Sequence, residues 1–302
     1  MRYSVRQDTR LFYRGSISDA RLNLRLKPVG WPGQTISGFS MTIDPQPAWR
    51  ADAPGPYLTH VTAVRYDQPV ETLRIVTEFT ADIHPPPVPS ATPAIGRIPE
   101  LAATTRRLDP LAPAPYLYGG PMTPLDETIG SWAAADLSPE MPVLDGARAL
   151  AARIHREFAY SSGSTTARTL PAEAFAQRKG VCQDFAHVLI VAMRMHGVPA
   201  AYVSGYLRTL PPPGRPRLVG ADAMHAWAAV WCGPDAGWIG IDPTNNSLAR
   251  DDHIFLGMGR DYADVAPVNG IFVGRARQQT DFRVDVVPAG EPAAHPLSRR
   301  SG

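Results

Sequence analysis

Residues 180–197 read Gly-Val-Cys-Gln-Asp-Phe-Ala-His-Val-Leu-Ile-Val-Ala-Met-Arg-Met-His-Gly and predict a buried helix with a thiol in its first turn. Apolar residues recur at the spacing of one helix face, at Phe185, Val188, Leu189, Ala192, Met193 and Met195. Gly197 and Pro199 end the helix. At such a helix start, unpaired N–H groups and the positive end of the helix dipole favour the thiolate form of Cys182. The stretch therefore offers a nucleophile.

Composition indicates a globular protein. The chain has 302 residues, of which 44% are hydrophobic and 19% are charged. A formal net charge of +2 gives no support to nucleic-acid binding. No stretch approaches the ~18 consecutive apolar residues of a membrane span, and the N-terminus lacks the apolar core of a signal peptide. We therefore expect a cytoplasmic protein without a membrane partner. The two cysteines, Cys182 and Cys232, are expected to stay reduced in that compartment.

The first part of the chain, residues 1–84, has the pattern of β-structure. Apolar and polar residues alternate over residues 21–26, 39–44 and 73–79, and clusters of glycine and proline separate these runs. Short alternating strands with such turns are typical of a small antiparallel β-sandwich. Residues 85–124 are rich in proline and predict a stiff, extended linker.

Residues 125–302 are expected to form an α+β core. Helices are predicted over residues 125–135, with Thr123 as a cap, and over 144–158 and 171–176, ahead of the central helix. Strands are predicted over 200–207, 225–231 and 238–242, with a hairpin tip at 210–214 and two further strands at 270–274 and 282–287. Helices followed by antiparallel strands indicate an α+β fold.

A thiol nucleophile needs a base, and the base needs an acceptor that orients it. His225 opens one predicted strand and Asp242 ends the next, so neighbouring strands would place the two side chains together on one sheet. The carboxylate would then fix the imidazole tautomer while the other ring nitrogen faces the sulfur of Cys182. His187 is five residues after Cys182 (187 minus 182), about 140° around the helix axis, and should face away from the thiol.

Two other interpretations of these residues stay open on spacing alone. Cys182 could be a small buried hydrophobe, with His225 a hydrogen-bonded strand residue and Asp242 a turn initiator. The three could also bind a metal, although no Cys-x-x-Cys or His-x-x-x-His pair supports that.

Four stretches together resemble the bacterial transglutaminase-like superfamily: Gly180-Val-Cys-Gln-Asp-Phe-Ala-His, Tyr202-Val-Ser-Gly-Tyr-Leu, His225-Ala-Trp and Asp242-Pro-Thr-Asn. The similarity continues through Gly259-Arg-Asp-Tyr-Ala-Asp-Val-Ala-Pro, and Asn23-Leu-Arg-Leu-Lys-Pro resembles the β-rich N-terminal region that accompanies this core in bacteria. The resemblance implies a papain-like α+β core with a catalytic triad of Cys182, His225 and Asp242.

The chemistry expected is nucleophilic acyl transfer through a thioester on Cys182. The backbone N–H of Cys182 is one expected oxyanion donor, and Tyr160 and Trp132 are candidates for the second. We favour hydrolysis of a peptide, isopeptide or amide bond in a peptide or protein substrate. The alternatives are amine cross-linking by a protein-glutamine gamma-glutamyltransferase and a non-catalytic binding module of the same fold. We expect no cofactor and no metal, because no acidic run offers a calcium site.

Overall fold

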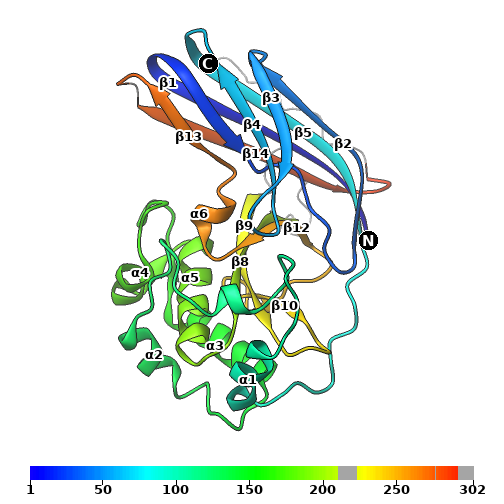
Figure 1. The fold of residues 1–302 in the computed structure, drawn as a ribbon, viewed down its shortest axis with the longest axis vertical. Helices are drawn as coiled ribbons and strands as arrows, with labels where there is room; N and C mark the ends of the chain where they lie inside the picture. Colours follow the sequence, from blue (N-terminus) through cyan, green and yellow to red (C-terminus); the bar gives the residue numbers. More distant parts are fainter. Residues whose placement is uncertain (210–222, 276, 292–302) are drawn as a thin grey trace.

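Two β-sheets organise the chain, one in a β-rich upper part and one in a mixed lower part of the molecule (Figure 1). The computed structural model describes residues 1–209, 223–275 and 277–291. The predicted hairpin tip at 210–214 lies outside these residues. Within them, no helix is long and apolar enough to cross a membrane.

The upper part is built on one long strand, β1 (Arg2–Leu24), where the sequence predicted only a strand over residues 21–26. Its neighbours follow in the order β2-β5-β1-β4-β3, all antiparallel. Their bounds are β2 (Gln34–Asp44), β3 (Trp49–Pro54), β4 (His60–Tyr66) and β5 (Val70–Ile83). The first half of β1 pairs with β5 and the second half with β4, so its alternating apolar side chains enter a core with those of both neighbours.

The last two strands of the chain also belong to this upper part. Both β13 (Val268–Val273) and β14 (Gln278–Pro288) pair antiparallel with β1. The structure therefore differs from the predicted division, which assigned residues 125–302 to the core. The sequence predicted two strands here, at 270–274 and 282–287, but a local pattern carries no information about which sheet receives them.

Residues 85–124, predicted as a stiff proline-rich linker, lie across the surface of the lower part and contain short helices. These are η1 (Ile95–Arg97), α1 (Ile98–Ala103) and η2 (Ala114–Tyr116). Ile95, Ile98 and Ala102 are buried against the helices of the core, and Tyr116 is buried against its sheet. The segment is thus part of the folded body.

The lower part has a five-stranded antiparallel sheet in the order β11-β10-β9-β8-β12. Its strands are β8 (Ala200–Leu207), β9 (Ala223–Trp231), β10 (Trp238–Asp242), β11 (Ser247–Leu248) and β12 (His253–Gly259). A short parallel pair, β6 (Ala159–Tyr160) and β7 (Lys179–Gly180), precedes it. The helices are α2 (Glu127–Ala133), α3 (Val143–Glu157), α4 (Pro171–Gln177), α5 (Cys182–Met195) and α6 (Tyr262–Val265).

The predicted central helix is α5, and it packs on β8 and β9 as the resemblance implied. It is buried along nearly its whole length, which explains its continuous apolar sequence. Gly197 adopts a φ of +72° just after the helix, a left-handed conformation that glycine allows without strain. At α2 the predicted cap is wrong: Asp126, not Thr123, accepts the N–H of Ile129 at 2.8 Å.

The two parts share one hydrophobic cluster. Tyr3, Val5 and Phe79 of the upper sheet are buried together with residues of β8 and β12 of the lower sheet, Tyr206, Ile254 and Leu256. Tyr206 adds a buried hydrogen bond from its hydroxyl to Gln7 Oε1 at 2.5 Å. The upper part is therefore packed against the edge of the sheet that carries the candidate site.

Candidate active site

Cys182 is the first residue of α5, and the chain just before it is held rigidly. The carboxylate of Asp184 accepts the backbone N–H of Val181 at 2.8 Å and the hydroxyl of Thr165 at 2.7 Å. Gly180 makes this turn possible, because a Cβ at that position would lie 2.6 Å from the Cβ of Asp184. The thiol is partly exposed, as a nucleophile must be.

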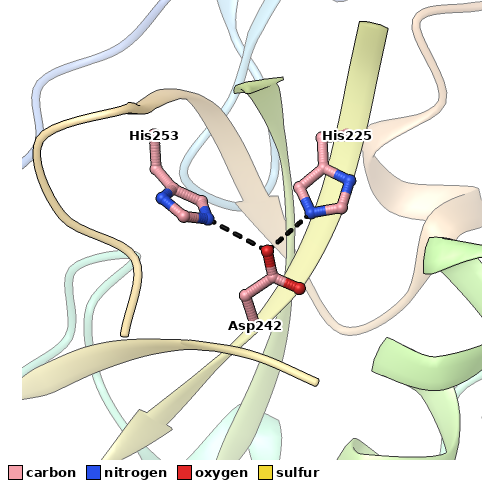
Figure 2. A group of neighbouring side chains, drawn as sticks. All are labelled: His225, Asp242 and His253. Carbon is pink, nitrogen blue, oxygen red and sulfur yellow. Dashed lines mark hydrogen bonds and ion pairs between the residues drawn. The ribbon is translucent and has the colours of Figure 1, made fainter. Parts of the chain in front are cut away.

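His225 and Asp242 come from neighbouring strands, as the sequence analysis predicted. The register of β9 and β10 pairs Ile241 with Ala228, which places Asp242 opposite Trp227 and diagonal to His225 on the same face. The Nε2 of His225 lies 2.8 Å from Oδ2 of Asp242 (Figure 2). An ionised carboxylate can only accept, so Nε2 carries the proton and Nδ1 is the nitrogen that can meet the thiol.

Asp242 is completely buried and surrounded by donors. Its Oδ1 accepts the backbone N–H groups of Thr244 at 2.9 Å and Asn245 at 3.2 Å. Its Oδ2 accepts the side-chain amide of Asn245 at 2.6 Å in addition to His225. Burial raises the pKa of Asp242, but the side-chain hydrogen bonds from His225, His253 and Asn245 and the charge of His225 outweigh burial and hold the pKa well below its usual range. The carboxylate is a fixed negative charge.

That charge acts on His225, whose side chain is only 8% exposed. Burial lowers the pKa of His225, but the hydrogen bond to Asp242 and the interaction with Cys182 outweigh burial and raise the pKa to about 10. The ring is therefore an imidazolium near neutral pH, poised between a carboxylate and a sulfur.

A second histidine, His253, belongs to the same cluster, and the sequence analysis missed it. Its Nε2 lies 3.0 Å from Oδ2 of Asp242, the oxygen that also binds His225 (Figure 2). The ring packs edge-on against Trp227, with centroids 5.1 Å apart. Its only sequence signal is a histidine that opens a strand eleven residues after the aspartate, which is too weak to distinguish it from a surface residue.

Ligand atoms of His225, Asp242 and His253 lie within 4.8 Å of one another, the kind of cluster that a metal ion could occupy. The hydrogen bonds account for this proximity, because both Nε2–H groups point at one carboxylate oxygen. A metal ion would have to displace both protons from a buried, satisfied network. The arrangement therefore fits a hydrogen-bonded cluster better than a metal centre.

His187, predicted to face away from the thiol, has partners other than the triad residues. It is fully buried, its Nε2 accepts the N–H of Tyr262 at 3.2 Å, and its ring contacts Tyr202. Burial lowers its pKa to about 3, so the ring is neutral. Its role is in packing.

The two candidates for the second oxyanion donor lie in different surroundings. Tyr160 pairs with Gly180 across β6 and β7, and burial, followed by the charge of Cys182, raises the pKa of its phenol. Trp132 lies among Phe175, Arg153 and Arg178, and its indole N–H donates to Glu157 at 3.1 Å. The indole donor is thus occupied, which leaves Tyr160 as the candidate beside the thiol.

Tyr202 is a further hydroxyl that sequence reasoning did not select. Burial raises the pKa of its phenol well above the usual range, and the charge of Cys182 raises it further. A tyrosine within a strand pattern is ordinarily core, so only the folded sheet reveals its position near the sulfur.

Cys232 is a buried thiol of another kind. It is not disulfide-bonded, and burial raises its pKa to about 12. Cys182 is therefore the more accessible of the two thiols.

Comparison with known proteins agrees with this geometry. A model of the transglutaminase-like superfamily matches residues 132–243, which include Cys182, His225 and Asp242. A model of the bacterial transglutaminase-like N-terminal region matches residues 3–82. The chain belongs to the transglutaminase-like superfamily. The resemblance stated from the sequence is thereby confirmed.

Relatives of this transglutaminase-like protein include an uncharacterised protein of Mycobacterium tuberculosis, 36% identical over 298 residues, which are 97% of this chain and 95% of that protein. A protein-glutamine gamma-glutamyltransferase of Pseudomonas aeruginosa is 36% identical over 93 residues, 30% of this chain and 14% of the other. Among solved structures, a candidate cysteine protease of Cytophaga hutchinsonii superposes with a TM-score of 0.73 at 20% identity, over 99% of this chain and 94% of the other. That likeness confirms the predicted fold class.

Proposed function

We propose that this transglutaminase-like protein is a cysteine-dependent acyl-transfer enzyme that hydrolyses peptide, isopeptide or other amide bonds through a thioester on Cys182. One observation carries the proposal: His225 is bonded through Nε2 to a buried carboxylate and interacts with Cys182. A structural histidine on a strand needs no such pair of partners. The thiol in the first turn of α5 supplies the nucleophile.

The first half of the reaction forms the thioester. The Cys182 thiolate adds to the carbonyl carbon of the amide, and the carbonyl oxygen becomes an oxyanion. The backbone N–H of Cys182, which has no partner within its own helix, and the hydroxyl of Tyr160 are the donors we assign to that oxyanion. The C–N bond then breaks as His225 passes its Nδ1 proton to the leaving nitrogen.

The second half releases the product. Neutral His225 takes a proton from water, and the hydroxide adds to the thioester carbonyl. The C–S bond breaks, the carboxylic acid product leaves and Cys182 is again a thiolate beside the His225 imidazolium. Asp242 keeps its charge throughout and holds the same tautomer in both halves, because it accepts five hydrogen bonds from its surroundings.

A second candidate function is transfer of the acyl group to an amine. The local match to the Pseudomonas gamma-glutamyltransferase favours it. The chemistry differs only in the acceptor, since a primary amine would lose its proton to His225 and attack the same thioester.

A glutamine-containing peptide with an electrophilic group, used alongside the unmodified peptide, tests both candidates. We expect the electrophile to label Cys182 in the full chain and not in the Cys182→Ala variant. Mass spectrometry of the unmodified peptide, incubated with and without a fluorescent primary amine, then identifies the acceptor. A carboxylic acid product in both incubations supports hydrolysis, whereas amine-linked product overturns that preference. An unlabelled Cys182 with no product contradicts the enzyme and favours a non-catalytic module.

A further inference from the structure

We propose that His253 is a positioning residue that acts on His225 through Asp242: it occupies the same carboxylate oxygen and thereby limits how strongly Asp242 holds the His225 imidazolium. The inference rests on the proposed function and adds a fourth side chain to the three that the resemblance implied. His253 also lies beyond the residues matched by the family model of the core, 132–243.

The position of His253 in the sheet is unexpected. It is the first residue of β12, and β8 and β9 lie between β12 and the strand that ends at Asp242. Its backbone N–H donates to Arg250 O at 3.1 Å, which fixes the start of the strand. From there the ring reaches back to Asp242 (Figure 2).

Within the described residues, His253 has one side-chain hydrogen bond, the one to Asp242. Its side chain is 8% exposed and packs against the ring of Trp227. A leucine or phenylalanine would fill this volume without the cost of burying a polar ring. The hydrogen bond to Asp242 is therefore the feature that an imidazole, rather than an apolar side chain, supplies here.

Asp242 does not depend on His253 for its orientation. The two backbone donors of Thr244 and Asn245 hold Oδ1, and the Asn245 amide also holds Oδ2. The contribution of His253 is then electrostatic. Every donor on Oδ2 stabilises the carboxylate, and a more stabilised carboxylate attracts the proton of His225 less strongly.

This sharing matters because His225 has two opposite tasks. It must be an imidazolium to protonate the leaving amine and a neutral base to activate water. Asp242 and Cys182 both favour the imidazolium. A competing donor on Asp242 weakens the preference of His225 for the imidazolium form. Neutral His225 is then available as the base in the second half of the reaction.

The direction of the effect does not depend on the charge of His253. If His253 is neutral, its N–H competes with His225 for Oδ2. If it is protonated, its positive charge also disfavours a second cation 6.1 Å away, the distance between the two ring centroids. The titratable groups acting on His225 are thus Cys182 on α5, Asp242 on β10 and His253 on β12.

His253 can be altered without touching the thiol. The ring borders a cavity of about 250 Å³ that is also lined by Trp31, the prolines at 85–87 and Trp238. His253 and Trp227 belong to the described residues that line this cavity, whereas Cys182 and His225 do not. A change at position 253 therefore reaches His225 only through the shared carboxylate or through packing.

Two variants separate those routes in the full chain. His253→Phe keeps the ring and its contact with Trp227 but removes the donor, and His253→Gln keeps an N–H donor at similar reach. Iodoacetamide alkylation of Cys182, followed by peptide mass spectrometry across the pH range in which the protein stays folded, reports the loss of the His225 proton as an alkaline rise in rate. We expect His253→Phe to move this rise up by roughly one pH unit, as for one charge-assisted hydrogen bond, and His253→Gln to restore it.

An unshifted or lowered alkaline rise in His253→Phe overturns the inference. If the wild-type protein shows no rapid alkylation of Cys182 below that rise, the proposed function itself fails, which is a different result.

A second measurement, on the wild-type protein, tests the inference even if a variant does not fold. Nitrogen-15 spectra of the histidine rings should show two downfield Nε2–H protons, one of which disappears in His253→Gln. A single such proton in the wild-type protein contradicts the shared carboxylate.

Discussion

The Nε2 of His225 lies 2.8 Å from Oδ2 of Asp242, and the two residues end up together because β9 and β10 are neighbours in one antiparallel sheet. The pairing converts a buried aspartate, normally costly, into a fixed charge that selects one tautomer of the imidazole. Several measurable consequences depend on this contact and on the residues that surround it.

Replacing Asp242 with asparagine should lower the acyl-transfer rate by about 10²–10⁴-fold. Both oxygens of Asp242 only accept hydrogen bonds. In asparagine an NH₂ group replaces one of these oxygens, and in either orientation of the amide that group would face hydrogen-bond donors. Steady-state kinetics with the peptide from the profiling experiment measures the change, and circular dichroism checks the fold. A folded variant with a wild-type rate would remove Asp242 from the mechanism.

The two cysteines should differ greatly in reactivity. Cys182 is partly exposed, whereas Cys232 is buried with a pKa raised to about 12. We expect iodoacetamide to alkylate Cys182 at least about 10²-fold faster than Cys232 near neutral pH, because the thiolate is the reacting form. Peptide mass spectrometry after timed quenching gives both rates from one sample, and the His225→Gln variant should slow only Cys182. Equal, slow rates would argue for a non-catalytic module.

Stability should fall in alkaline solution because of His225. Its pKa in the folded protein, about 10, lies above the ordinary value of 6.5. The stabilisation is therefore complete below pH 6.5 and is lost as the pH rises through 10. Thermal melts of wild type and His225→Gln should differ most at the acid end of that window and converge at its alkaline end. A constant difference across the window would mean that the effect of His225 is packing alone.

Tyr160→Phe should reduce the acyl-transfer rate by about 10-fold to 10²-fold with little change in KM, because an oxyanion donor acts in the transition state. Trp132→Phe is the matched control, since the Trp132 N–H is held by Glu157. That variant should lose some stability and keep its rate. A loss of rate in Tyr202→Phe but not in Tyr160→Phe would transfer the role to Tyr202.

Gly205→Ala should destabilise the protein by about 2–3 kcal/mol through overpacking. Gly205 lies opposite His225 across β8 and β9, and a Cβ there would overlap Ile254 O and the ring of Trp227. Displaced, Trp227 would no longer support the rings of His225 and His253. Chemical denaturation measures the change in stability, with Gly30→Ala as the control because no atom lies within 4 Å of a Cβ at Gly30. Equal stabilities would show that the sheet absorbs the methyl group.

Local patterns predicted much of the secondary structure. The apolar spacing from Phe185 to Met195 matches a helix that is buried on nearly all sides, and the strands predicted around His225 and Asp242 are present as β9 and β10. The spacing of apolar residues along the chain reflects which side chains are buried, so a single sequence carries this information. The cap of α2 was misplaced because Thr123 and Asp126 are both competent N-cap residues, and the cap depends on backbone geometry.

By itself, the sequence predicted Cys182, His225 and Asp242 as nucleophile, base and orienting aspartate, because each stands at the start or end of a predicted element and the order of the motifs matches a known family. The tertiary structure alone decided that His253 shares the Asp242 carboxylate, that Tyr202 interacts with Cys182 and that β13 and β14 return to the first sheet. Such contacts join strands that are distant in the chain. Local periodicity determines which way a side chain points, but the order of strands in a sheet determines which side chains it meets.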